Sequence, residues 1–488
     1  MKKKPNIIFI LTDDQGAWAM GCAGNKDIQT PNLDSLAQEG IRFDNFHCAS
    51  PVCSPARASI VTGQIPSCHG VQDWISGGNL DAWKYPWMSE MEDFNMEDHA
   101  IDYLAGRKTY MEVLAENGYN CALSGKWHLG DNATRKKGFS KWYTIGRGGC
   151  HYYAPDICDE GEMSIGDQYV TELITQRALD DIRELSKEPA PFYLSVHYTA
   201  PHSPWNREEH PQKYLELYKD CTFTATPDLP LHPMQINTCP VGDTPEKRKE
   251  NLTGYYAAIS AADEGIGKIK ELLEQEGILD NTVIIFTADN GMNMGHHGIW
   301  GKGNGTYPPN MYESAIKVPF IIRLPESNMR GSVCRMAASQ YDIFPTILEL
   351  ADCPPETEPL QPGQSLVPHF RCPSAPIDRD VVIFDEYGKT RMIKKDGFKY
   401  IHHYDADFNE LYHLTEDPDE VENLWGRAEY ESQISIMKQE MEEWFARYSI
   451  PAYDGTQHNV TGRGQRDLCD KENAFHQSFA YVKGNPFK

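Results

Sequence analysis

Short runs of apolar, β-branched and aromatic residues alternate along this chain with longer amphipathic segments. Strands buried on both faces are predicted over residues 7–11, 192–196, 283–286 and 318–322. Helices are predicted between them over residues 110–116, 168–185 and 246–276. Strands that alternate with helices form a mainly parallel sheet, because two successive parallel strands need a long crossover connection. The pattern therefore predicts an α/β fold with a large, mainly parallel or mixed central sheet flanked by helices.

Beyond residue 376 the pattern changes to shorter strand-like segments separated by turn residues, over 381–385, 390–394 and 398–402. Such segments predict a small antiparallel sheet, which is followed by a polar helix over 429–448. We therefore expect a large N-terminal α/β domain (residues 1–375) and a C-terminal subdomain of sheet and helix (376–450). The tail (451–488) is rich in glycine, asparagine and charge, and it indicates no particular structure.

The charge of the chain argues against two classes of partner. Lysine and arginine number 46 against 71 aspartate and glutamate residues, a formal net charge of −25. A chain this acidic is not expected to present the positive face that follows a nucleic-acid backbone or an anionic membrane surface. The apolar run at 7–11 is also far shorter than the roughly 20 residues of a membrane-spanning helix. We expect no nucleic acid and no membrane partner.

The N-terminus and the thirteen cysteines bear on the cellular compartment. The basic residues 1–4 are followed by only five apolar residues before Asp13, too few for a signal peptide. The odd number and scattered spacing of the cysteines give no disulfide framework, so we expect reduced and mostly buried thiols. A cytoplasmic location is predicted, although a chain from which a leader had been trimmed would read the same.

Acidic and amide side chains directly follow two predicted strands. Asp13 and Asp14 follow the strand at 7–11, and Asp289 and Asn290 follow the strand at 283–286. Open α/β sheets bind ligands beyond the carboxyl ends of their strands, where such residues can meet. An all-oxygen set with three carboxylates suits Ca²⁺, or less well Mg²⁺, and lacks the ligands of zinc. Separate turn and cap residues are the alternative interpretation.

Basic residues follow the other predicted strand ends. Lys126 and His128 come after the apolar run at 120–124, and His202 comes shortly after the strand at 192–196. Lys302 lies in a glycine-rich loop beyond Asp289. Each residue taken singly is typical of a solvated loop. Because several strand ends in one chain carry such residues, they predict a shared site.

The segment around Cys53 is the most informative of these motifs. Ser54 is predicted as the N-cap of a short helix, with Pro55 in its first turn and Gly63 at its end. Cys53 would then lie at a helix N-terminus, which favours an anion and lowers the pKa of a thiol, with Arg57 one turn on. The spacing fits an anion pocket with a nucleophile, and it fits a buried cysteine beside a surface helix equally well.

Together these motifs resemble a known family. Cys-Ser-Pro-Ala-Arg at 53–57 matches the Cys-X-Pro-X-Arg signature of the formylglycine-dependent (type I) sulfatases, in the alkaline phosphatase superfamily. Residues 5–14, 125–130, 200–202 and 287–291 resemble further landmarks of that family in the family order. Residues 411–424 resemble the closing segment of its small C-terminal sheet. The resemblance covers residues 5–425 and leaves the tail outside.

The resemblance implies a sulfatase that hydrolyses sulfate monoesters to an alcohol and inorganic sulfate. It implies that a formylglycine-generating maturase oxidises Cys53 to formylglycine, whose hydrate supplies the nucleophilic oxygen. The Ca²⁺ ligands that it implies are Asp13, Asp14, Asp289, Asn290 and the modified Cys53. The catalytic residues that it implies are Cys53, Arg57, Lys126, His128, His202 and Lys302.

The resemblance also gives these residues roles. Arg57, Lys126 and Lys302 would bind the sulfate together with the metal. His128 would be the base that takes a proton from the hydrate, and His202, with Lys302, would protonate the departing alcohol. Lys302 is the least constrained of these assignments, because His296 and His297 occupy the same long loop.

Rings and hydrogen-bonding side chains in the loops at 69–74 and 148–153 suit a sugar. The resemblance implies a sulfated carbohydrate, so we expect a small sulfated sugar as substrate. Two other functions stay open. A phosphonate or phosphate ester hydrolase of the same superfamily would share the cysteine signature. A non-catalytic binder of sulfated glycans would result if Cys53 were never converted, although the chain keeps every candidate catalytic residue.

Overall fold

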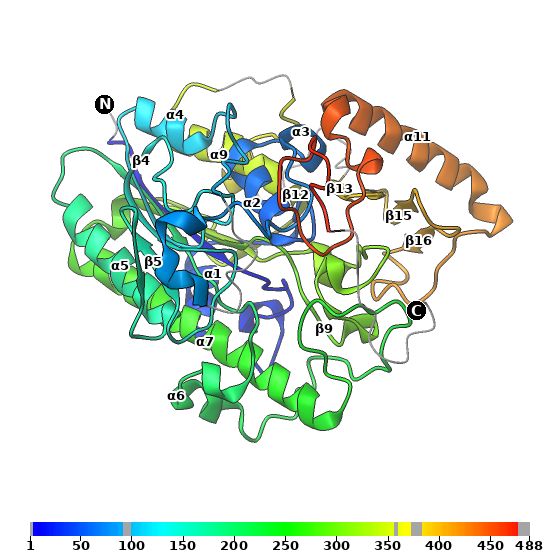
Figure 1. The fold of residues 1–488 in the computed structure, drawn as a ribbon, viewed down its shortest axis with the longest axis horizontal. Helices are drawn as coiled ribbons and strands as arrows, with labels where there is room; N and C mark the ends of the chain where they lie inside the picture. The colour runs from blue at the N-terminus through cyan, green and yellow to red at the C-terminus, as the bar shows by residue number, and fades with distance from the viewer. Residues whose placement is uncertain (1–2, 91–98, 356–359, 372–382, 477–488) are drawn as a thin grey trace.

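A ten-stranded mixed sheet forms the centre of the molecule (Figure 1). The computed structural model describes residues 3–90, 99–355, 360–371 and 383–476. The strand order is β12-β2-β11-β8-β1-β7-β3-β4-β5-β6. In that order the strands are Ser332–Ser339, Ile41–His47, Phe320–Arg323, Thr282–Ala288, Asn6–Thr12, Phe192–His197, Asn120–Gly125, Phe139–Ile145, Asp156–Asp159 and Glu162–Ile165. The predicted α/β class is confirmed.

Four neighbouring strands at the centre of the sheet, β8, β1, β7 and β3, run parallel. Thr12 at the end of β1 lies opposite Ala288 of β8, and Leu11 lies opposite His197 of β7. The carboxyl ends of these strands therefore meet at one edge of the sheet. Side chains of β1 alternate between two apolar cores, with Phe9 in one and Ile8 in the other, which explains its unbroken apolar run.

Helices cover both faces of the sheet, as Figure 1 shows. On one face lie α1 (Pro31–Glu39), α5 (Val170–Leu185) and α7 (Pro245–Gln275). On the other face lie α2 (Cys53–Thr62), α4 (Tyr110–Glu116) and α9 (Ile343–Leu350). The helices predicted from periodicity are α4, α5 and α7, each within two residues of its bounds. The shorter helices are α3 (Pro66–His69), α6 (Gln212–Leu215), α8 (Glu313–Ile316) and α10 (Val367–Arg371).

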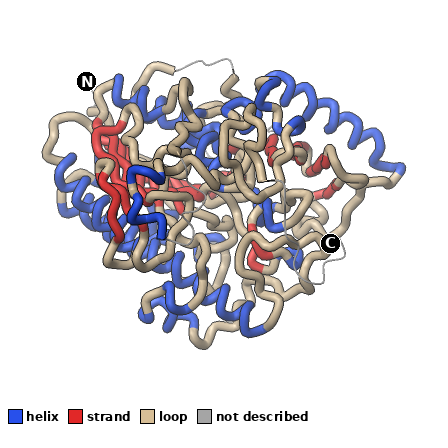
Figure 2. The backbone as a smooth tube through the Cα atoms, in the orientation of Figure 1, coloured by secondary structure: helices blue, strands red, loops and turns tan. Residues whose placement is uncertain are grey.

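A second, four-stranded antiparallel sheet follows in the order β13-β14-β15-β16 and lies beside helix α11 (Figure 2). These elements are Ile383–Tyr387, Thr390–Lys395, Phe398–His403, Glu410–His413 and, for α11, Glu431–Tyr448. Met437 and Phe445 of α11 share a core with Ile393 and Tyr400 of the sheet. The predicted small sheet with its helix is confirmed. Residues 381 and 382, and the predicted boundary between 375 and 376, lie outside the described residues.

The described part of the tail, residues 451–476, returns to the large domain and adds no strand to the small sheet. Gln465 pairs with Ile75 in a β-bridge, and its side-chain oxygen accepts a hydrogen bond from the backbone N–H of Gln72 at 2.7 Å. The tail therefore covers the segment that follows α3. Every described cysteine is a free thiol. Among the described helices, none has both the length and the apolar character needed to cross a membrane.

Candidate active site

The acidic residues that follow β1 and β8 meet because these two strands are neighbours. Single carboxylate oxygens of Asp13, Asp14 and Asp289 lie within 4.8 Å of one another. Asp289 Oδ1 accepts hydrogen bonds from the backbone N–H groups of Asp14 (3.1 Å) and Asn290 (2.8 Å). All four residues are buried. Asp14 has a φ of 64°, a left-handed conformation that is uncommon outside glycine and concentrated at functional sites.

Three basic side chains each pair with one carboxylate of this cluster. Arg57 Nε lies 2.8 Å from Asp289 Oδ2, and Lys126 Nζ lies 2.5 Å from Asp13 Oδ2. Lys302 Nζ lies 2.6 Å from Asp14 Oδ1. Pairing of buried charges offsets part of the cost of removing them from water. The three cations therefore compensate part of the repulsion among the three carboxylates.

Two oxygens of the cluster keep free acceptor capacity. Asp13 Oδ1 and Asn290 Oδ1 are buried and have no hydrogen-bond partner among the described residues. Asn290 is oriented by its own Nδ2, which donates to Asp14 Oδ1 at 2.8 Å. Buried oxygens without a partner are costly unless an ion or water satisfies them. This all-oxygen set can hold a hard divalent cation.

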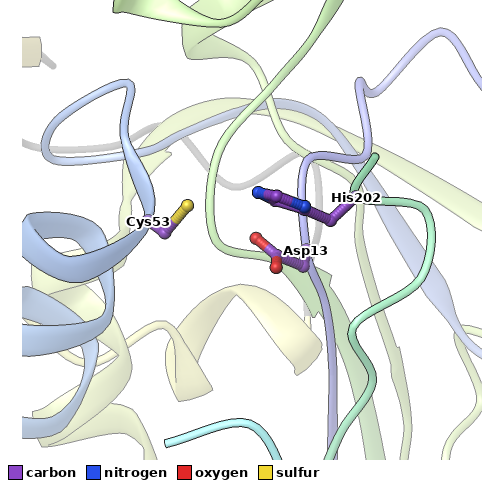
Figure 3. Close-up of side chains that lie close together, drawn as sticks. All are labelled: Asp13, Cys53 and His202. Atoms are coloured by element: carbon purple, nitrogen blue, oxygen red, sulfur yellow. The ribbon is translucent and has the colours of Figure 1, made fainter. Parts of the chain in front are cut away.

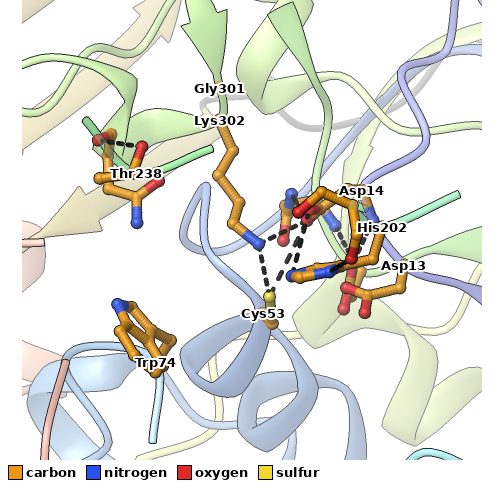
Figure 4. A network of polar contacts seen from close by, with 12 residues as sticks. Asp13, Asp14, Cys53, Trp74, His202, Thr238, Gly301 and Lys302 are labelled. Carbon is orange, nitrogen blue, oxygen red and sulfur yellow. Dashed lines mark hydrogen bonds and ion pairs between the residues drawn. The ribbon is translucent and has the colours of Figure 1, made fainter. Parts of the chain in front are cut away.

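Helix α2 begins at Cys53 and places its side chain next to the cluster (Figure 4). The sulfur lies 2.7 Å from Lys302 Nζ and 3.8 Å from Asp14 Oδ1. Figure 3 shows that Cys53, Asp13 and His202 point into a common space. The helix ends as predicted, because Gly63 has a φ of 67° and its N–H donates to the carbonyl of Ser59.

Two predictions about this helix are wrong. Val52 is the extended residue before the helix, and the hydroxyl of Ser54 accepts from the backbone N–H of Ile75 at 3.0 Å, so Ser54 is not the N-cap. Burial and the neighbouring Asp13 raise the pKa of the Cys53 thiol above its ordinary value, where the sequence predicted a lower one. Complete removal from water outweighs the helix terminus and the nearby cations.

His128 is held in one tautomer. Its Nε2 lies 2.9 Å from the carbonyl oxygen of Ile75, which can only accept, so Nε2 carries the proton. The other nitrogen, Nδ1, is buried and has no partner among the described residues. Burial and the Lys126 ammonium hold the pKa of His128 well below its ordinary value. The ring is therefore neutral and offers a lone pair at Nδ1.

His202 faces the cluster from the loop after β7. Its Nδ1 donates to the carbonyl of Ser203 at 2.7 Å, and its Nε2 lies 3.7 Å from Asp14 Oδ2. The hydroxyl of Tyr152 donates to the carbonyl of His202 at 2.8 Å and fixes the loop. The side chain is 26% exposed, so Nε2 can reach a ligand that enters from solvent.

The loop between β8 and α8 places Lys302 next to Cys53, whereas the two histidines of this loop pack against aromatic rings elsewhere. His296 packs on Trp18, with ring centroids 4.7 Å apart, and His297 stacks on Tyr312 at 3.7 Å. Burial disfavours the charged form of Lys302, but Asp14 outweighs it and holds the pKa of the ammonium well above its ordinary value. Of the three competing side chains, Lys302 is the one that contacts Cys53.

A cavity of about 700 Å³ opens above Cys53, His128, His202 and Lys302. None of the described residues that line it is acidic. Sequence reasoning missed several of its lining residues, which are Arg147, Asn237, Thr238, Asn304, Arg463 and His476. Arg463 and His476 belong to the tail, and no motif marks them. Arg463 and His476 reach the cavity through contacts of the tail with residues that are far away in the sequence.

Some residues of the loops that were expected to contact a sugar line the cavity, and others are buried in the core. Trp74 and residues 148–151 line the cavity. The neighbours of Trp74 at 69, 72 and 73 are buried in packing contacts, and Asp73 bonds to Tyr387 and Gly464. Tyr152 is likewise buried. The cavity therefore offers one large aromatic plane, Trp74, beside several polar groups.

Family models match most of the chain. A model described as Sulfatase matches residues 5–353, and a model described as N-sulphoglucosamine sulphohydrolase, C-terminal, matches residues 295–447. The chain is 29% identical to the N-acetylglucosamine-6-O-sulfatase of Bacteroides thetaiotaomicron, over 96% of this chain and 91% of that protein.

Solved structures share the fold. One, a complex with its substrate D-glucosamine-2-N,6-O-disulfate, superposes with a TM-score of 0.77 and 27% identity, over 91% of this chain and 98% of that one. The phosphonate monoester hydrolase of Agrobacterium radiobacter superposes with a TM-score of 0.67 at 20% identity, over 91% of this chain and 96% of that one. The latter likeness concerns the fold alone.

Proposed function

Since the chain belongs to the sulfatase family of the alkaline phosphatase superfamily and is a sulfuric ester hydrolase, we propose that it releases inorganic sulfate from sulfated sugars. The observation that carries the proposal is Cys53, set among three cations at the floor of a cavity whose described lining residues include no acidic side chain. The substrate class is supported by two similar proteins, an N-acetylglucosamine-6-O-sulfatase and a neighbour solved with a glucosamine disulfate.

Two groups complete the proposed site. Cys53 would be oxidised by a formylglycine-generating maturase, and the hydrate of formylglycine supplies the oxygen that attacks sulfur. Asp13, Asp14, Asp289 and Asn290 would hold Ca²⁺, with the modified residue 53 as a further ligand. The oxygens of Asp13 and Asn290 that lack a partner support this assignment. When bound, the ion supplies positive charge to the sulfate oxygens.

The cations of the chain bind and orient the ester. Arg57 uses Nε on Asp289 and Nη1 on the carbonyl of Lys126, while its buried Nη2 has no partner among the described residues. Nη2 is therefore free to donate to a sulfate oxygen. Lys126 and Lys302 add two ammonium groups around the same position. Fixed donors in a buried site stabilise the negative charge that grows on the departing oxygen.

Two histidines move protons in this proposal. His128 accepts a proton at Nδ1, the nitrogen with the free lone pair, because Nε2 is committed to the carbonyl of Ile75. His202 donates from Nε2 to the departing alcohol, with its Nδ1 fixed by Ser203 and with Lys302 nearby. Each histidine thus has one nitrogen for orientation and one for chemistry.

We predict that Gly148→Ala lowers kcat/KM for 4-nitrophenyl sulfate by about 10- to 100-fold. A Cβ atom at residue 148 would lie 2.0 Å from His128 Nε2, so the ring must move. Gly149→Ala is the matched control, because its Cβ would lie 3.5 Å from His202 Cε1, an ordinary contact. Steady-state kinetics and melting curves of both variants test this. Equal activities would exclude a need for His128 in its present position.

We predict that His202→Ala lowers turnover of alkyl sulfates about 10²-fold or more, and turnover of aryl sulfates much less. An alkoxide needs protonation to leave, whereas nitrophenolate leaves unaided. The measurement is kcat on a sugar 6-sulfate and on 4-nitrophenyl sulfate with the same preparation. A loss of the same size on both esters would remove His202 from the role of acid.

The proposed function is tested by the mass of the peptide that contains Cys53 and by sulfate release, on protein made together with a maturase. Conversion to the aldehyde lowers the mass by about 18 Da. We expect conversion together with turnover of 4-nitrophenyl sulfate. Full conversion with a strong preference for a matched aryl phosphonate would favour the phosphonate hydrolase. Binding of sulfated glycans without any release of sulfate would favour the binder.

A further inference from the structure

The tail supplies an arginine that the proposed chemistry does not use. Arg463 lines the cavity above Cys53 and forms no ion pair with a described acidic residue. Its one described hydrogen bond runs from Nη1 to the backbone carbonyl of Asn237, at 3.4 Å. The two other lysine or arginine side chains among the described lining residues are paired, Arg147 with Asp156 and Lys302 with Asp14. Arg463 is therefore the cation whose charge is left for a ligand.

The backbone of Arg463 is fixed on both sides. The carbonyl of Gly462 accepts from Trp74 Nε1 at 3.2 Å and from Asn304 Nδ2 at 3.1 Å. The N–H of Gly464 donates to the buried carboxylate of Asp73 at 3.1 Å. The tail is thus attached both to the Trp74 segment and to the loop that carries Lys302. An arginine held in this way loses little conformational freedom when it binds.

Close packing explains why glycine stands on each side of this arginine. A Cβ atom at residue 462 would lie 2.9 Å from the side chain of Asn304, and one at residue 464 would lie 2.6 Å from Ser76. Both glycines have positive φ angles, 77° and 110°. The close approach of the tail at these two residues therefore requires glycine, and Arg463 lies between them.

A second polar side chain of the tail lies beside Arg463. His476 lines the same cavity, and its Nε2 lies 3.2 Å from the hydroxyl of Ser76. Burial and the charges of Arg466 and Arg463 lower the pKa of His476, so the ring is neutral at pH 7. The wall thus combines one unpaired cation with a neutral ring, in a chain whose net charge is −25.

We infer that Arg463, with His476 beside it, binds a second sulfate group of the same sugar whose first sulfate ester is cleaved at residue 53. This inference rests on the proposed function and makes Arg463 a specificity residue. The planar guanidinium matches two oxygens of a sulfate, and it is weakly hydrated. None of the described lining residues is acidic, so none of them repels a second anion.

Binding is measured by calorimetry with the Cys53→Ala variant in the presence of Ca²⁺, so that no turnover occurs. The probes are two disulfated sugars with their monosulfated parents. One pair is D-glucosamine 2-N,6-O-disulfate and D-glucosamine 6-sulfate, and the other is N-acetylgalactosamine 4,6-disulfate and N-acetylgalactosamine 6-sulfate. At least one disulfated sugar should bind about 10- to 100-fold more tightly than its parent.

Arg463→Gln in the same background should abolish that preference. Arg466→Gln is the matched control, because it removes the same charge from an exposed position three residues away that does not line the cavity. It should leave the ratio of the two dissociation constants, for the disulfated sugar and its monosulfated parent, within about 2-fold of the ratio measured with the Cys53→Ala variant alone.

Two outcomes would overturn the inference. One is that neither disulfated sugar binds more tightly than its parent. The other is that the preference survives Arg463→Gln or falls equally in Arg466→Gln. Turnover of 4-nitrophenyl sulfate by the converted wild-type protein is measured separately, because this ester has no second anion. Failure there and on every sulfated sugar tested would reject the proposed function, whereas the ratio of binding constants judges the second sulfate site by itself.

Discussion

Cys53→Ala is expected to lower kcat for 4-nitrophenyl sulfate by at least about 10⁴-fold, even on protein made together with a maturase. Alanine cannot be converted to the aldehyde, so the site keeps its cations and loses its nucleophile. The remaining activity would come from the cations around the sulfate, as in hydrolases that lack their nucleophile. The measurement is sulfate release with enzyme concentrations high enough to detect a single turnover.

The fold should tolerate this change. The sulfur of Cys53 contacts Lys302 and Asp14, and those two side chains remain paired with each other at 2.6 Å. Cys121→Ala is the matched control, because it makes the same change at a fully buried cysteine of β3 outside the cavity. It should keep activity within about 3-fold, and it loses packing energy together with the weak hydrogen bond from its sulfur to the carbonyl of Met111. Substantial turnover by Cys53→Ala would contradict the nucleophile assignment.

The strands that the sequence predicted well are those buried on both faces. The run at 7–11 appears as β1 (Asn6–Thr12), and the run at 283–286 appears as β8 (Thr282–Ala288). The strands β2 and β12 were not predicted. In β2, Arg42 and Asp44 alternate with apolar residues, and β12, at the edge of the sheet, is only partly buried. A strand with polar residues on one face can be distinguished from a loop only by the neighbouring strands with which it pairs.

The residues of the site also differ in how far the sequence alone could place them. Asp13 and Asp289 could be brought together from the sequence, since each ends a parallel strand and such ends meet at one edge. Arg57 follows from its helical spacing to Cys53. The side chain that contacts the sulfur from a long loop, Lys302, could be placed only by the resemblance, because His296 and His297 had equal claims. Arg463 had no signal at all, since glycine contacts with Asn304 and Ser76 bring it to the cavity.

Charge explains how an acidic protein can serve an anionic substrate. The chain as a whole carries an excess of carboxylates, while the described residues that line the cavity include none. The acidic residues closest to the reaction centre, Asp13, Asp14 and Asp289, are each paired with a cation. Exposed charges beyond about 10 Å are screened by salt, so the local arrangement decides binding. From the net charge we predicted no nucleic-acid partner and no anionic membrane partner. The net charge carries no information about the local charge of the cavity.

Removal of Ca²⁺ by a chelator is expected to lower kcat by about 10³-fold and the melting temperature by roughly 5 °C. Without the ion, three buried carboxylates lie within 4.8 Å of one another, and the oxygens of Asp13 and Asn290 lack a partner. A cation that binds only the folded chain stabilises it in proportion to the logarithm of its concentration. Added Ca²⁺ should restore both quantities, and Mg²⁺ should restore them less.

The melting temperature separates a structural metal site from an indirect effect on turnover. Asn290→Ala removes one proposed ligand, so the upward shift of the melting temperature on addition of Ca²⁺ should fall by at least half. Asp263→Asn is the matched control, because it changes a buried carboxylate that bonds to Asn32 and Leu33, away from the cluster. That variant should keep the full shift, although its own stability is lower. If exhaustive chelation changes neither activity nor melting temperature, the three cations alone balance the carboxylates and no calcium site exists here.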